Sequence, residues 1–87
     1  MTSPQETYRA AIVRALEAHL ARVKAARGTR DLAISTTKNL AEHDVRRLTI
    51  YAESNEVYDK AILVSDAQRV KDDADALAAL KATGEAD

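Results

Sequence analysis

Residues 39–65 constrain the fold more than any other stretch, because read as a helix they are apolar on two opposite sides. The wide apolar stripe collects Leu40, Ala41, Val45, Leu48, Tyr51, Ala52, Tyr58, Ile62 and Leu63. The narrow stripe, on the other side, collects Ile50, Val57, Ala61 and Val64. Exposed apolar surface is unfavourable in water, so both sides need cover. The pattern predicts a central helix with Leu48 among the most buried residues.

A helix with clear start and stop signals precedes this stretch. Ser3 is a good N-cap, Pro4 occupies the first helical position, and Glu6 completes a capping box. Arg27 and Gly28 supply a stop signal, a cation in the last turn followed by glycine. These signals predict a helix over residues 4–27, ending at a Gly28 with positive φ.

Capping boxes also mark the elements that follow. Residues 28–38 read as a connection, because Ser35, Thr36 and Thr37 favour turns. A box starting at Asn39 predicts a helix over residues 39–64, and a box starting at Ser65 predicts a third helix over residues 65–82. No glycine or proline lies between Asn39 and Thr83, so one uninterrupted helix over residues 39–81 is the alternative.

The composition predicts a thin hydrophobic core. The 87 residues suffice for one domain, but they include no Phe and no Trp, and Ala buries little area. Small scaffolds of this kind are commonly completed by oligomerisation. The expected fold is therefore all-α: a three-helix bundle or an antiparallel helical hairpin with a long central helix, completed by oligomerisation.

The two ends of the chain differ in charge. Residues 1–30 hold six basic and two acidic residues, whereas residues 53–87 hold four basic and nine acidic residues. Such polarity can steer a partner or favour antiparallel self-association. The chain has no cysteine, no apolar run long enough to span a membrane and no secretory signal pattern, so we expect a cytoplasmic protein.

Motifs for chemistry are sparse. One helical turn from His19 or His43 the sequence offers no further metal ligand, so no metal site is expected. No phosphate-binding loop, nucleophile elbow or metalloprotease motif occurs, so we expect no cofactor, no catalytic residues and no enzyme activity. The nearest feature to a site is a candidate buried polar cluster of His19, Asp44, Asn55 and Asp59. These residues can instead fix helix register, or lie at stripe edges in water.

The sequence therefore predicts a non-enzymatic helical module for protein–protein interaction or assembly. Its partner is expected to be a second copy, in a homodimer, or a larger assembly that it serves as an accessory subunit. The candidate interface is the narrow stripe of Ile50, Val57, Ala61 and Val64. The alternative is a small nucleic-acid-associated regulator that uses the basic residues of the first helix.

Overall fold

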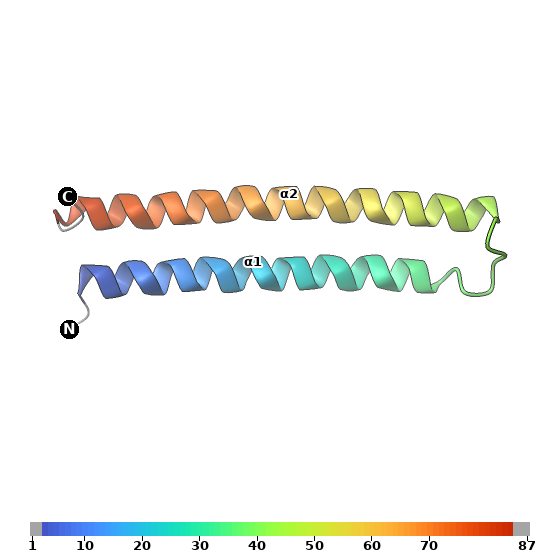
Figure 1. Cartoon of the computed structure of the whole chain (residues 1–87), viewed down its shortest axis with the longest axis horizontal. Coiled ribbons are helices and arrows are strands. Elements are labelled where there is room, and N and C mark those ends of the chain that lie inside the picture. The colour runs from blue at the N-terminus through green and yellow to red at the C-terminus, as the bar shows by residue number, and fades with distance from the viewer. Residues whose placement is uncertain (1–2, 85–87) are drawn as a thin grey trace.

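In the computed structural model, which describes residues 3–84, the chain forms two long helices. Helix α1 spans Pro4–Ser35 and helix α2 spans Val45–Ala82. The helices pack side by side and run in opposite directions (Figure 1). No strand occurs between residues 3 and 84, so the all-α prediction is confirmed. The predicted third helix is not a separate element, because residues 65–82 continue α2.

Helix α1 begins where its capping box predicts and ends later than predicted. The Oγ atom of Ser3 accepts a hydrogen bond from the backbone N–H of Glu6 at 3.1 Å. The predicted end at Arg27 is wrong, because the helix continues through Gly28 to Ser35. A glycine inside a helix costs only about 1 kcal/mol. The continued helix places the Arg30 guanidinium 4.4 Å from the centre of the Tyr58 ring on α2, a contact that offsets this cost.

The connection spans residues 36–44 and not the predicted residues 28–38. The hydroxyls of Thr36 and Thr37 donate to the carbonyls of Ala33 and Ile34 at 2.6 and 2.7 Å, and they satisfy acceptors at the end of α1. Thr37 is only 1% exposed, so it anchors the connection against the helices. The remaining residues of the connection reverse the chain.

Helix α2 starts at Val45 instead of Asn39 and is continuous to Ala82. Its N-cap is Asp44, whose carboxylate accepts from the backbone N–H of Arg46 at 2.9 Å. Ser65 does not cap a third helix, because its hydroxyl bonds to side chains of α1 across the interface. Gly84, at φ 77°, follows the end of α2 and takes the positive-φ role that was predicted for Gly28.

Very little of this structure is buried. Among residues 3–84 only Ala15, Thr37 and Ser65 are buried. Leu48 is 54% exposed, so its predicted burial is wrong: the wide apolar stripe turns Tyr58 and Ile62 toward α1 and leaves Leu48 outside the contact. The Cα radius of gyration is 19.4 Å, whereas a compact chain of 87 residues has a value of about 12 Å. Within the described residues, neither helix has an apolar stretch long enough to cross a membrane.

Candidate functional site

A polar cluster joins the middles of the two helices. The Nδ1 atom of His19 lies 2.8 Å from the Oγ atom of Ser65. The same Oγ accepts from the Nε–H of Arg22 at 2.8 Å, and a second Arg22 nitrogen donates to the Ser65 carbonyl at 3.4 Å. On the other side of the ring, the Nε2 atom of His19 lies 3.4 Å from a carboxylate oxygen of Asp66. One residue pair from each helix thus forms a connected network of hydrogen bonds.

Small side chains bring the helices close enough for this network. The residues of α1 that face α2 include Ala11, Ala15 and Ala26, and the residues of α2 that face α1 include Ala61 and Ala76. A small side chain lets two backbones approach, and Ala15 is 5% exposed as a result. The closest part of the contact line therefore consists of small and polar groups; isoleucines such as Ile12 and Ile62 are half-buried beside it, and many of the leucines and valines are exposed.

The geometry of the cluster is suited to holding the helices in register. With the proton of neutral His19 on Nε2, Ser65 donates to Nδ1, and Nε2–H donates to Asp66. Ser65 is only 2% exposed and its oxygen also accepts from Arg22, so a substrate has no approach to that hydroxyl. A buried hydroxyl that is fully hydrogen-bonded favours one alignment of the helices over slipped alternatives.

The structure places the four residues of the predicted polar cluster apart. His19 is half-buried at the middle of α1. Asp44 caps α2 and pairs with Arg46 at 2.9 Å, which lowers the pKa of the Asp44 carboxyl through the side-chain hydrogen bond. Asn55 and Asp59 are exposed on α2. Of these residues, only His19 belongs to the cluster between the helices.

Sequence reasoning missed Arg22, Ser65 and Asp66 as the partners of His19. The available signal was the recurrence of small residues at alternating three- and four-residue spacing, which marks the close contact line of two helices. Between residues 3 and 84, no three His, Asp or Glu side chains converge where a metal ion could bind. One buried oxygen of Asp73 has no hydrogen-bond partner within that range, and Arg69 lies 3.9 Å from the other.

The main exposed apolar surface lies on one side of the helix pair, the side on which Asp66 meets His19. Counting about 100° per residue from Ala15 and Ser65 turns eight exposed large aliphatic side chains in this direction, and three of them, Val13, Val45 and Leu63, lie about 160° from the contact line, at the outer edge of this surface. We call this surface the leucine face, and its members are Val13, Leu16 and Leu20 of α1 with Val45, Leu48, Leu63, Val70 and Leu77 of α2. Single exposed aliphatic residues are ordinary, but a shared face of eight is a candidate interaction surface.

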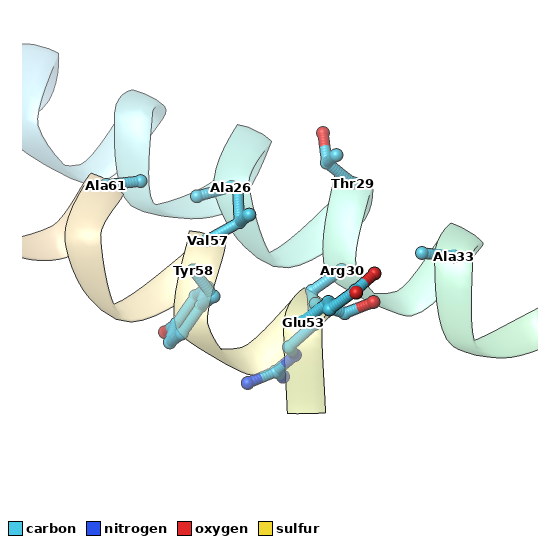
Figure 2. A pocket seen from close by; sticks show the side chains of 9 residues that line it. Ala26, Thr29, Arg30, Ala33, Glu53, Val57, Tyr58 and Ala61 are labelled. Carbon is cyan, nitrogen blue, oxygen red and sulfur yellow. The ribbon is translucent and has the colours of Figure 1, made fainter. Parts of the chain in front are cut away.

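The opposite surface, the groove face, carries a groove of about 420 Å³ between the helices (Figure 2). Small residues of α1, including Ala26 and Ala33, line one wall, and Val57 and Ala61 of α2 line the other. The narrow stripe predicted as an interface lies on this face. Of its members, Val57 and Val64 are 62% and 70% exposed, whereas Ile50 and Ala61 are half-buried.

The two helices also differ in charge where they lie together. Helix α1 carries six basic and three acidic residues, and the part of α2 beside it, residues 53–82, carries four basic and seven acidic residues. The antiparallel arrangement therefore sets the basic helix against the acidic half of its neighbour. No protein-family model matches the chain, and no curated protein or solved structure matches it significantly.

Proposed function

We propose that the chain is a non-enzymatic helical module that works by self-association. The observation that carries this proposal is the distribution of apolar side chains. Eleven large aliphatic residues are exposed, whereas the only buried apolar residue between residues 3 and 84 is Ala15. Hydrophobic burial is the main favourable contribution to folding, so a pair of helices with this distribution needs a further apolar surface to pack against.

The surface area supports the same proposal. The chain exposes 6487 Å², whereas a compact monomer of 9.5 kDa exposes about 5,000 Å². A standard protein–protein interface covers about 800 Å² on each partner. The excess is therefore large enough to supply one complete interface per copy.

The nucleic-acid alternative has weaker support. Phosphate binding requires cations clustered on one surface. The basic residues of α1 point in several directions around the helix, and the acidic half of α2 lies beside them. Self-association, either in a free homodimer or within a larger assembly, is therefore the better-supported proposal. The cytoplasm remains the expected compartment, which a sequence without cysteine favours.

Sedimentation equilibrium on the full chain, with far-UV circular dichroism at each concentration, tests the proposal. Self-association predicts a mass at or above twice 9.5 kDa and a helical content that falls on dilution. A cooperatively folded chain that stays at monomer mass at high concentration contradicts the proposal. Titration of duplex DNA in low salt tests the alternative, which requires binding that weakens steeply as salt is added.

A further inference from the structure

On the basis of the self-association proposed above, we further propose how the second copy docks. Two copies pack leucine face to leucine face, so that α1 of each copy lies against α2 of the other. In this arrangement Arg27 of one copy lies beside Asp59 of the second copy. The result is a four-helix bundle in which every helix has antiparallel neighbours.

The choice of face follows from the side chains on each surface. Eight of the eleven exposed large aliphatic residues lie on the leucine face. The groove face holds the other three, Leu32, Val57 and Val64, among Ala, Thr and charged residues. Burial of apolar area is worth about 25 cal/mol per Å², so the surface with more large aliphatic residues gains more from being covered.

The register of the helix pair fixes what lies at each height along the leucine face. His19 contacts Ser65 and Asp66, and Arg22 also contacts Ser65, so residues equally far from these contacts in opposite directions along the two chains lie near one height. At this register Arg27 lies near the height of Asp59, and Leu16 lies near the height of Val70. Leu20 lies near the height of Asp66 and, toward the other end, Arg9 lies near the height of Leu77.

The two edges of the leucine face are therefore complementary in charge at the end nearer the connection. The α1 edge includes, in order, Arg9, Val13, Leu16, Leu20 and Arg27. The α2 edge, read at about the same heights, includes Leu77, Asp73, Val70, Asp66 and Asp59. The matched positions are Leu16 with Val70 and Arg27 with Asp59. Arg27 and Asp59 form no ion pair within residues 3–84, so both are available to a second copy.

This complementarity selects one of two symmetric arrangements. A two-fold axis along the length of the pair places α1 over α2 of the second copy at unchanged height, so Arg27 meets Asp59. The other two-fold axis lies in the interface and runs perpendicular to the helices. It places α1 of one copy over α1 of the second copy with its direction reversed, so Arg27 of one copy lies near Arg9 of the other. Like charges in contact are unfavourable, so the charges favour the axis along the length. Asp66, already paired with His19, lies at the middle of the face as the polar position that fixes register.

Charge reversal tests the arrangement in the full-length chain. The homodimer dissociation constant, measured by sedimentation at moderate salt, should rise roughly tenfold for Arg27→Glu and for Asp59→Arg, because each breaks two symmetric pairs. The double variant Arg27→Glu/Asp59→Arg restores both pairs and should recover most of the affinity. Arg14→Glu is the matched control, since Arg14 lies on the groove face and its reversal should leave the dissociation constant unchanged.

Several results would overturn this arrangement while self-association stands. Tighter binding by Arg27→Glu alone indicates α1 over α1, because the new glutamate then meets Arg9. A dimer that survives Val70→Asp and is lost in Val57→Asp indicates the groove face. Circular dichroism of each variant shows whether the helices remain folded. A wild-type chain that is monomeric contradicts the proposed function itself, which is a different outcome from a dimer with another interface.

Discussion

The Nδ1 atom of His19 and the hydroxyl of Ser65 lie 2.8 Å apart, although 46 positions separate these residues in the sequence. The contact sits near the middle of both helices, where a shift of one helix along the other would break it. Arg22 adds a second bond to the same hydroxyl, so the two bonds converge on the Ser65 oxygen. Ser65 is therefore the central residue of the cluster that holds the two helices in register.

We predict that Ser65→Ala lowers the free energy of unfolding by about 1–3 kcal/mol, because it leaves the half-buried side chains of His19 and Arg22 without this partner. Urea denaturation at fixed protein concentration measures the change. The matched control is Ser54→Ala on the same helix, where no side-chain hydrogen bond is lost and the effect should be small. Equal effects of the two substitutions would contradict the role given to Ser65.

Ala15 marks the closest approach of the helices, at 5% exposure. We predict that Ala15→Leu destabilises the pair by about 1–3 kcal/mol, because the larger side chain forces the backbones apart. Ala18→Leu adds the same atoms at an exposed position one turn away and should change stability little. Thermal unfolding followed by circular dichroism distinguishes the two variants. If Ala15→Leu stabilises the pair, the helices are not in close contact there.

Gly28 lies inside α1, and a Cβ atom added there meets no heavy atom within 4 Å. We predict that Gly28→Ala raises the free energy of unfolding by about 0.5–1 kcal/mol, since alanine loses less backbone entropy in a helix. The reciprocal change Ala25→Gly, also exposed and helical, should lower it by a similar amount. Destabilisation by Gly28→Ala would restore the original prediction of a positive-φ glycine.

The N-cap of α2 should make its first turn sensitive to acid. Hydrogen bonds from Arg46 lower the pKa of Asp44 below its ordinary value of 3.8. The ionised carboxylate is thus favoured by folding, so its contribution is complete above pH 3.8 and is lost as the pH falls through the lowered pKa. NMR titration of the Arg46 amide should show a transition below pH 3.8. In Asp44→Asn, which keeps a neutral cap, that transition should be absent.

Local signals in the sequence predicted the start of α1 at Pro4 and the end of the last helix at Ala82 well, and the boundaries between them poorly. The box from Ser3 to Glu6 caps α1 because the Ser3 hydroxyl accepts from the backbone N–H of Glu6 within the same turn. The similar box at Ser65 does not start a helix, because His19 and Arg22 take up its hydroxyl from another part of the chain. A contact between residues 46 positions apart cannot be read from local spacing.

The contact face of the helices was harder to predict than their existence. Apolar periodicity alone predicts that Leu48 and the rest of the wide stripe form the buried face. In the structure the close contact is made by small and polar groups such as Ala15 and Ser65, which contribute little to an apolar pattern. The exposed leucines and valines therefore identify a surface that the two-helix pair leaves uncovered, whereas the isoleucines are half-buried between the helices. For the candidate site, His19 was identified from its position on α1, and its partners became visible only when the register was known.

The pair is 62 Å long and only 19 Å wide between Cα atoms, with Pro4 and Ala82 at one tip and residues 36–44 at the other (Figure 1). A rod of this kind has two chemically different tips. When two copies share a two-fold axis along their length, equivalent tips lie together, and the assembly keeps its polarity. Such a dimer would act as a directional spacer, holding whatever binds one tip at a fixed distance from whatever binds the other.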